Sequence, residues 1–318
     1  MTNLLITGAN GFLGTHIKNQ FLHTQHTLNI LAPTSSEINV LKLKQLVSYC
    51  ITNNISEILH LAAKCGGIFH NANSPADFLY ANTQMALNIY EAARICGVEY
   101  VHSLGSVCMY PKYCPTPFKE DYILGNFPKD FLTVGNYPEE TNAPYGQAKR
   151  TLMMLGQTYR QQYGIKGSFL IPVNLYGPHD TFNTTTAHVI PSLIMKFDDA
   201  KNNNMPQVEC WGNGTTTSRE FLYAVDCSEV ISQVVLSNFD CELPINIGTG
   251  KEIKIFDLAH MIAKIVGYSG DIVFNGKLDG QPRRCLDVSR AKELLNWEAK
   301  TSLYDGLVKT VEWYRKSI

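Results

Sequence analysis

The segment SLGSVCMYP, residues 103–111, places a hydroxyl and a thiol two positions apart, at Ser106 and Cys108, behind a short apolar run. If this run is a strand, alternate positions at its end point to the same side. A hydroxyl can polarise a carbonyl oxygen, and a thiolate can remove a proton. A free cysteine on its own is more often a small buried core residue, so other parts of the chain must decide.

A tyrosine and a lysine four positions apart, Tyr145 and Lys149, stand in the segment NAPYGQAKR. On a helix, this spacing puts both side chains on one face. A lysine cation beside a phenol is expected to lower the phenol pKa from about 10, which makes tyrosine a usable proton donor near neutral pH. A tyrosine and a lysine at this spacing occur often by chance. The pair indicates a catalytic site here because it follows a glycine loop and Ser106 in the chain.

The glycine loop LLITGANGFLGTHI holds Gly8, Gly11 and Gly14 between a predicted strand and a predicted helix. Glycines permit a tight turn, and a helix N-terminus offers free N–H groups, so we predict a site for the pyrophosphate of a dinucleotide. After the next predicted strand, no acid occupies residues 33–36, and Glu37 comes later. An acid there would hold the 2′-hydroxyl of NAD, so its absence favours NADP(H) as the cofactor.

These residues need a framework that brings them together, and the hydrophobic pattern predicts one. Short apolar runs predict strands, and longer periodic segments predict helices. The strands are expected at 4–7, 27–32, 58–63, 100–103 and 167–172, and the helices at 12–21, 43–52, 84–96 and 145–163. Their alternation predicts an α/β fold with a doubly wound parallel sheet, whose ligands bind at the carboxyl ends of the strands.

The pattern loosens from about residue 178, where Gly, Asn, Thr and Pro become common. We therefore predict a dinucleotide-binding domain over residues 1–177, with returns from about 221–243. A smaller, mixed α/β substrate-binding region is expected over residues 178–318.

The composition indicates which partners and which cellular location to expect. The 318 residues are 45% hydrophobic and carry a net charge of −1, which argues against nucleic acid or an anionic membrane as the main partner. The 9 cysteines include no CxxC pair, which indicates neither a disulfide framework nor a zinc site, and no metal is expected. Neither a signal peptide nor a membrane-spanning run is recognisable, so we expect a cytoplasmic protein.

With these motifs in order, the chain resembles the extended short-chain dehydrogenase/reductase family. The segments HLAAKCGGI (60–68) and GPHDTF…HVIP (177–191) are similar to its GDP-L-fucose synthase subfamily, and nearly the whole chain can be matched. That subfamily epimerises C3 and C5 of GDP-4-keto-6-deoxy-D-mannose and then reduces C4. The resemblance implies a Rossmann-type sheet, NADP(H), a GDP-linked keto-deoxy sugar as substrate, and a homodimer that pairs the helices predicted at 84–97 and 145–163.

The resemblance also implies residue roles. Ser106, Tyr145 and Lys149 would perform the reduction, Cys108 would be the epimerisation base, and His188 its acid partner, with His179 as a competitor. The predicted cofactor site comprises Gly8, Asn10, Gly11, Phe12, Leu13, Gly14, Ser35, Ser36, Asn39, Leu61, Ala62, Ala63, Leu104, Lys149, Pro172, Asn174, Leu175 and His188. The predicted nucleotide-sugar site comprises Asn174, Lys196, Trp211, Arg219 and Asp279. Ordinary alternatives are a solvated helix charge for Lys196 and a core position for Trp211.

Two departures from the subfamily pattern leave the sugar open. The segment before Tyr145 is a few residues longer, and the spacing from Trp211 to Arg219 is one residue longer. Another GDP-linked 4-keto hexose or heptose is therefore an alternative substrate. A non-catalytic dinucleotide sensor is the alternative outside enzymes, but a sensor needs no proton donor such as Tyr145.

Overall fold

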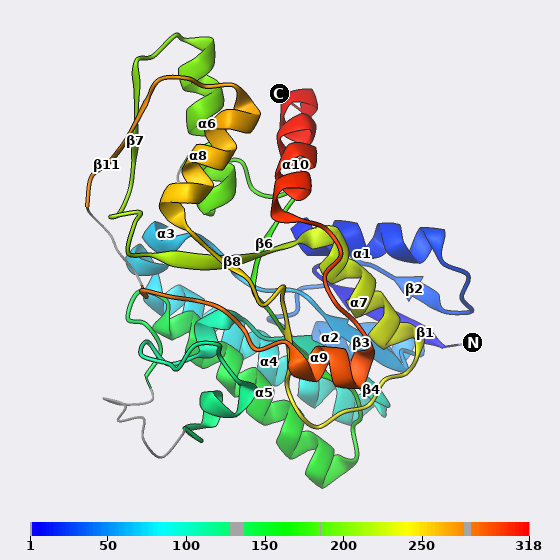
Figure 1. Ribbon diagram of the computed structural model, residues 1–318. Coiled ribbons are helices and arrows are strands. Elements are labelled where there is room, and N and C mark those ends of the chain that lie inside the picture. The colour runs from blue at the N-terminus through cyan, green and yellow to red at the C-terminus, as the bar shows by residue number, and fades with distance from the viewer. Residues whose placement is uncertain (1, 128–136, 185, 277–280, 318) are drawn as a thin grey trace.

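The computed structural model describes residues 2–127, 137–184, 186–276 and 281–317 (Figure 1). A parallel sheet with helices on both faces makes up the larger part. A smaller lobe beside it is built from three helices and two strands, with the C-terminal helix on its inner side. The predicted fold class, an α/β Rossmann-type doubly wound sheet with a smaller mixed region, is confirmed.

The main sheet has six strands in the order β2-β1-β3-β4-β5-β9, and every neighbouring pair is parallel. Apolar side chains fill these short strands, because helices cover both faces and leave neither face to water. The strands are β1 (Asn3–Thr7), β2 (Asn29–Leu31), β3 (Glu57–His60), β4 (Tyr100–Leu104), β5 (Phe169–Pro172) and β9 (Ile245–Ile247).

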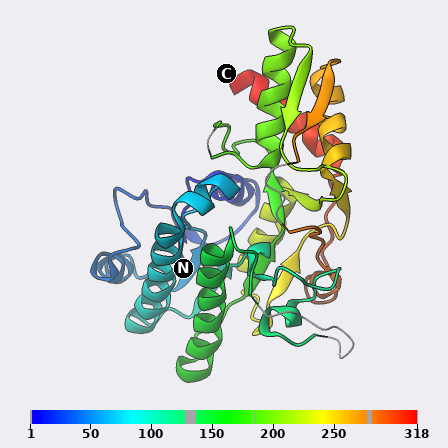
Figure 2. The ribbon, with the colours of Figure 1, turned by 90° about the vertical axis from the view of Figure 1, so that its left-hand side faces the viewer.

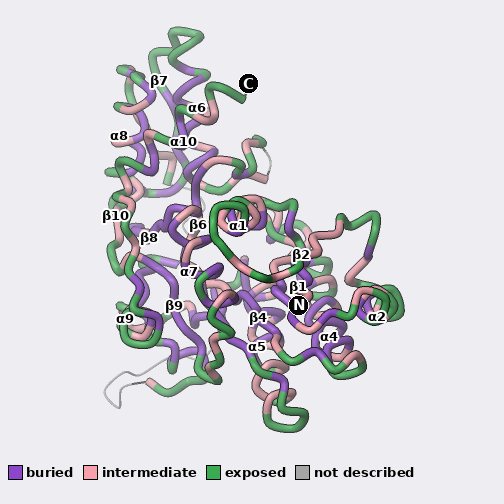
Figure 3. The backbone as a smooth tube through the Cα atoms, turned by 90° about the vertical axis from the view of Figure 1, so that its right-hand side faces the viewer, coloured by how far each residue is buried: buried purple, intermediate pink, exposed green. Residues whose placement is uncertain are grey.

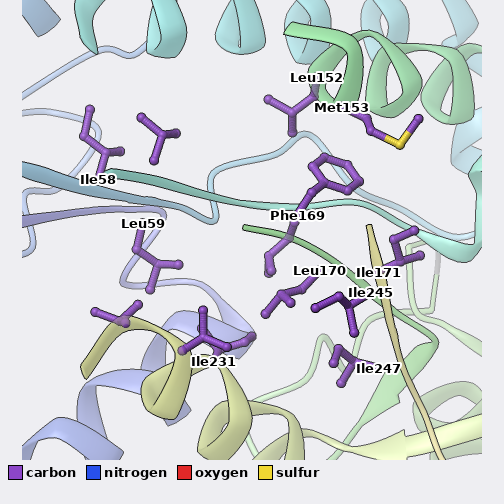
Figure 4. Close-up of a cluster of buried hydrophobic side chains, with 14 of the residues drawn as sticks. Ile58, Leu59, Leu152, Met153, Phe169, Leu170, Ile171, Ile231, Ile245 and Ile247 are labelled. Atoms are coloured by element: carbon purple, nitrogen blue, oxygen red, sulfur yellow. The ribbon is translucent and has the colours of Figure 1, made fainter. Parts of the chain in front are cut away.

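Helices α2 (Leu43–Thr52), α4 (Pro75–Cys96) and α5 (Ala143–Tyr163) pack together on one face of the sheet, and α1 (Phe12–His23) and α7 (Ala224–Leu236) pack together on the other. Figure 4 shows the resulting layers, with Leu152 and Met153 of α5 on one side of the strands and Ile231 of α7 on the opposite side. Burial of these apolar side chains contributes about 25 cal/mol per Å² to stability. The short helix α9 (Ser289–Leu295) packs beside β9.

A second hydrophobic cluster forms the smaller lobe. Its core lies between α6 (Val189–Asn202), α8 (Ile255–Val266) and α10 (Leu303–Ser317), and buried positions alternate with exposed ones along residues 207–210 (Figure 3). Strands β7 (Gln207–Cys210) and β11 (Asp271–Phe274) pair in this lobe, and β6 (Asn174–Tyr176), β8 (Ser218–Tyr223) and β10 (Glu252–Lys254) form a three-stranded sheet. Although β9 and α9 follow residue 178, they belong to the first cluster.

Local sequence signals explain where the long helices begin and end. Helix α5 has Pro144 in its first turn and ends at Gly164, whose φ of +72° suits a glycine C-cap. Helix α2 matches its predicted range, but α4 begins at Pro75, nine residues before the predicted start at 84. The prediction missed this extension because polar and β-branched residues interrupt the pattern there, whereas in the structure Phe78 and Asn82 are buried.

Three further short elements connect the sheet to the site: α3 (Ile68–Asn73), η1 (Val107–Met109) and η2 (Glu120–Leu124). Within the described ranges, every helix is too short or too polar to cross a membrane.

Candidate active site

The loop after β1 forms a tight cradle at the start of α1. Gly8 has a φ of +73°, and a Cβ at this position would lie 2.7 Å from the Ala62 nitrogen. A Cβ at Gly14 would lie 2.4 Å from the Gly8 oxygen. Gly11 is the N-cap of α1, no side chain caps this helix, and its first turn carries no acid. The first-turn N–H groups are therefore free for an anion, which fits the pyrophosphate of a dinucleotide.

The neighbouring predicted cofactor residues surround this cradle. Asn10 accepts a hydrogen bond from the Lys18 ammonium at 2.6 Å. Phe12 and Leu13 begin α1, and the Phe12 ring lies edge-on to His16 with 5.7 Å between centroids. The positive charge of Lys18 thus lies beside the loop that would hold the phosphates.

The turn after β2, which is predicted to bind the ribose, is closed by hydrogen bonds to Glu37. The Thr34 N–H and hydroxyl donate to Glu37 Oε2 at 2.6 and 2.8 Å, and these bonds lower the pKa of Glu37. Ser35 and Ser36 are exposed on the same turn, and Asn39 follows it half-buried. Glu37, the acid that follows the predicted ribose-binding residues, is thus held by hydrogen-bond donors of the turn itself.

The other predicted cofactor residues lie at or beyond the carboxyl ends of neighbouring strands. The Leu61 N–H donates to the Thr7 oxygen at 3.1 Å, which holds the loop with Ala62 and Ala63 against β1. The strand order reverses between β1 and β3, and ligands of such sheets bind in the crevice at that point. Beyond it, Leu104, Pro172, Asn174 and Leu175 lie on β4, β5 and β6.

Tyr145 and Lys149 lie one turn apart in the first turns of α5. The Lys149 ammonium is 5.8 Å from the centre of the Tyr145 ring and donates to the Leu104 oxygen at 2.8 Å. The Tyr145 hydroxyl lies 3.4 Å from the Cys65 sulfur, and its ring packs edge-on to Phe78. The phenol and the ammonium thus lie between the ends of β3 and β4.

The expectation that Lys149 lowers the pKa of Tyr145 is wrong for this structure. Burial raises the pKa of Tyr145 well above its ordinary value, and Cys65 adds to the rise. Burial also lowers the pKa of Lys149. A phenol with its ordinary pKa of about 10 is already protonated at neutral pH, so this rise makes Tyr145 a weaker acid in this structure.

Ser106 and Cys108 lie in the turn that follows β4. The Cys108 N–H donates to the Ser106 hydroxyl at 3.2 Å, and this bond caps η1. A guanidinium nitrogen of Arg284 lies 4.0 Å from the Cys108 sulfur, and Arg284 also donates to Gln281 at 2.9 Å. Arg284 is only 7% exposed, so this half-buried thiol has a buried cation beside it.

The two candidate acid histidines have different surroundings. His188 is the N-cap of α6, its side chain is 51% exposed, and its Nδ1 lies 4.0 Å from Asp180 Oδ1. His179 packs between His16 and Trp313, at centroid distances of 5.6 and 4.9 Å. Both histidines are therefore exposed, but His179 packs against aromatic rings whereas His188 has a carboxylate beside it.

The loop with His188 contacts the loop with Cys65. The Gly67 N–H donates to the Thr186 oxygen at 3.2 Å, and a Cβ at Gly67 would lie 2.9 Å from the Ala187 oxygen. This contact places the segment before α6 next to the loop that contacts Tyr145.

The predicted nucleotide-sugar residues fall into separate groups. Lys196 on α6 donates to the Glu209 oxygen at 2.9 Å, and its ammonium lies 5.2 Å from the Trp211 ring centre. Trp211 is 54% exposed, so it is not a core residue. Arg219 lies on β8, where it donates to the Ser218 oxygen at 2.7 Å, and Asn174 pairs with the same strand through the Glu220 oxygen. Asp279 lies outside the described residues.

Sequence reasoning missed two residues of this site, Cys65 and Arg284. Cys65 is separated from Tyr145 by 80 positions, and Arg284 from Cys108 by 176. The only local signal for Cys65 was its place directly after the third strand, inside a glycine-rich loop. Nothing near Arg284 in the chain indicates a partner in the turn after β4.

Gly146 allows α5 to lie directly on the turn that carries Cys108, and we expect Gly146→Ala to disturb the site. A Cβ at Gly146 would lie 2.3 Å from the Cys108 oxygen, so helix and turn must separate. We expect a loss of about 1–3 kcal/mol in unfolding free energy, typical of overpacking, and at least a roughly tenfold loss of kcat. Gly156→Ala is the control, because its Cβ on the same helix would meet the Tyr90 hydroxyl instead. Equal kcat losses in both variants would contradict a specific role for the Gly146 contact.

Comparisons with known proteins identify a family and several relatives of this chain. The model of the NAD dependent epimerase/dehydratase family matches residues 4–248. A GDP-L-fucose synthase of Escherichia coli is 38% identical over 320 residues, which cover 98% of this chain and 96% of that protein.

Solved structures with the same architecture cover nearly the whole chain as well. A GDP-6-OMe-4-keto-L-xylo-heptose reductase from Campylobacter jejuni has a TM-score of 0.87 at 25% identity, over 100% of this chain and 98% of that one. A GDP-mannoheptose C4 reductase from Campylobacter jejuni, solved with NADP bound, has a TM-score of 0.86 at 26% identity, over 99% and 98% of the two chains.

Proposed function

This chain belongs to the NAD dependent epimerase/dehydratase family and, within it, to the GDP-L-fucose synthases, and from this we propose that it converts GDP-4-keto-6-deoxy-D-mannose to GDP-L-fucose. The enzyme is an NADP-dependent oxidoreductase with epimerase activity on a GDP-linked sugar. The proposal concerns the particular sugar, the order of the steps and the residues that perform them.

One observation supports the proposal: the helix that carries the groups for reduction packs on the turn that carries the thiol. Helix α5 bears Tyr145 and Lys149. At Gly146 this helix packs directly against the carbonyl oxygen of Cys108, whose N–H donates a hydrogen bond to the Ser106 hydroxyl. An enzyme that only reduced its ketone would need no thiol there. The combination supports proton removal and carbonyl reduction on one bound sugar.

The proposed epimerisation uses the acidity of the carbon atoms next to the C4 ketone. The Cys108 thiolate takes the proton from C3 or C5, and the C–H electron pair moves to the carbonyl oxygen to give an enolate. His188, protonated, donates its N–H proton to the other face of that carbon, and the carbonyl group re-forms. The thiol and the neutral imidazole then exchange protons with water, so the step is a net isomerisation. Reference pKa values of about 8.5 for cysteine and 6.5 for histidine suit this exchange near neutral pH.

The proposed reduction follows at C4. NADPH, when bound, supplies the hydride. Tyr145 donates its phenolic proton to the C4 oxygen, and the Ser106 hydroxyl donates a hydrogen bond to the same oxygen. Lys149, by the family pattern, holds the nicotinamide ribose.

The cradle around Gly8, Gly11 and Gly14 would hold the pyrophosphate, because its close backbone contacts exclude side chains and leave the α1 N–H groups free. The exposed Ser35 and Ser36 would meet the phosphorylated ribose of NADP(H).

The deciding experiment incubates the protein with NADPH and GDP-4-keto-6-deoxymannose in deuterated water and identifies the product by NMR. We expect GDP-L-fucose that carries deuterium at C3 and C5. Reduction without deuterium would identify a reductase only, and turnover solely with another GDP-linked 4-keto hexose or heptose would reassign the sugar. NADPH binding without turnover of any keto sugar would support the sensor alternative.

We also propose that the enzyme is a homodimer, paired through α4 and α5. These helices lie side by side at the outside of the sheet (Figure 2), and they expose Tyr80, Leu87 and Met154. We expect light scattering to give twice the monomer mass for the wild type, and Leu87→Arg to give a monomer, because a charge would be buried in the interface. Leu22→Arg, an exposed leucine on α1, is the control, and a dimer that survives Leu87→Arg would exclude this interface. A cytoplasmic location is supported by the nine cysteines, all of which are free.

A further inference from the structure

A buried carboxylate lies beside the candidate acid His188. Asp180 belongs to the loop between β6 and α6, and its side chain is 3% exposed, against 51% for His188. Asp180 Oδ1 accepts the Thr181 N–H at 2.7 Å and lies 4.0 Å from His188 Nδ1. Asp180 Oδ2 is buried and has no hydrogen-bond partner among the described residues.

A buried carboxylate with a free oxygen is costly unless a cation or a donor compensates it. Two imidazoles are close enough to do so, His16 and His188. The Nε2 of His16 already lies 2.8 Å from the Pro178 oxygen, and burial lowers the pKa of His16, so that ring is neutral at neutral pH. Of these two imidazoles, His188 therefore remains to face Asp180.

The residues next to Asp180 in its loop hold it in place. His179 adopts a φ of +67°, which is unusual for a residue with a side chain, and its exposed ring contacts those of His16 and Trp313. Phe182 stacks on Tyr314 of α10, with 4.6 Å between centroids. The carboxylate is thus held beside α1 and α10, and the half-exposed His188 ring lies at the start of α6.

We propose that Asp180 is a positioning residue that holds His188 as a protonated imidazole with Nδ1 toward the carboxylate and Nε2 toward the sugar. The inference rests on the proposed function, in which His188 returns the proton. The carboxylate fixes the ring orientation and stabilises its positive charge before proton donation, without touching the substrate itself. It also explains the free Oδ2, which is available to the imidazolium as its ring turns.

The test measures deuterium incorporation at C3 and C5 of GDP-4-keto-6-deoxymannose with oxidised NADP bound, so that no reduction follows. Asp180→Asn keeps the shape and removes the charge, and we expect at least a roughly tenfold loss of the exchange rate, a part of the 10²–10⁴-fold that a general acid contributes. Asp180→Glu should recover part of the rate. In a His188→Gln background, Asp180→Asn should add no further loss, because the two residues act as a unit.

Asp198→Asn is the matched control, since this buried aspartate of α6 pairs with Arg315 on α10, away from His188. It should lose stability and keep the exchange rate. Normal exchange in Asp180→Asn, or additive losses in the double variant, would overturn the positioning role and leave the proposed function standing. Absence of exchange in the wild type would overturn both.

Discussion

Tyr145→Phe is expected to lower the rate of ketone reduction by about 10²–10⁴-fold, while NADPH still binds. The substitution removes only the phenolic oxygen, which lies 3.4 Å from the Cys65 sulfur at the edge of the site. The ring would keep its packing against Phe78, and Lys149 would keep its bond to the Leu104 oxygen. The loss should therefore appear in kcat and not in the dissociation constant of NADPH, measured by fluorescence titration.

The matched control is Tyr159→Phe. Tyr159 lies on the same helix, and its hydroxyl donates to Glu91 of the neighbouring helix α4. This variant should reduce the ketone at the wild-type rate. If Tyr145→Phe turned over normally, the proton donor would have to be another group. Deuterium exchange at C3 and C5 offers a second readout, because it should persist in Tyr145→Phe when epimerisation precedes reduction.

Cys108→Ser is expected to lower deuterium exchange by about 10²-fold or more and to leave the capacity for hydride transfer. A serine hydroxyl keeps nearly the same size, but it does not ionise near neutral pH as a thiol does. The Arg284 guanidinium, 4.0 Å from the sulfur, would then face a hydroxyl in place of the thiol. NMR of the keto sugar in deuterated water measures the exchange, and NADPH oxidation with an already epimerised ketone measures the reduction.

Two further thiols make this experiment specific. Cys65 also contacts Tyr145, so a large loss of exchange in Cys65→Ser, with normal exchange in Cys108→Ser, would move the base to residue 65. Cys241, next to the start of β5, is remote from the turn after β4 and serves as the control for a thiol-to-hydroxyl change. Retained exchange in Cys108→Ser would remove that thiol from the mechanism.

The local sequence predicted most of what depends on neighbouring residues. Short apolar runs indicated five of the six strands of the main sheet, all except β9, and the range 43–52 matched α2 from end to end. A proline at the start and a glycine at the end mark α5, whose first turns hold Tyr145 and Lys149 one turn apart. The glycine spacing indicated the cradle, because a positive φ and close backbone contact are properties of a few consecutive residues.

Tertiary structure decided what depends on burial and on distant parts of the chain. The raised pKa of Tyr145 is one such result, because desolvation by the surrounding elements outweighs the lysine one turn away. The contacts of Cys65 with Tyr145, and of Arg284 with Cys108, join residues that no local pattern relates. Chain spacing can place two side chains on one helix face, but the electrostatic environment of a site is set by the packing of every element around it.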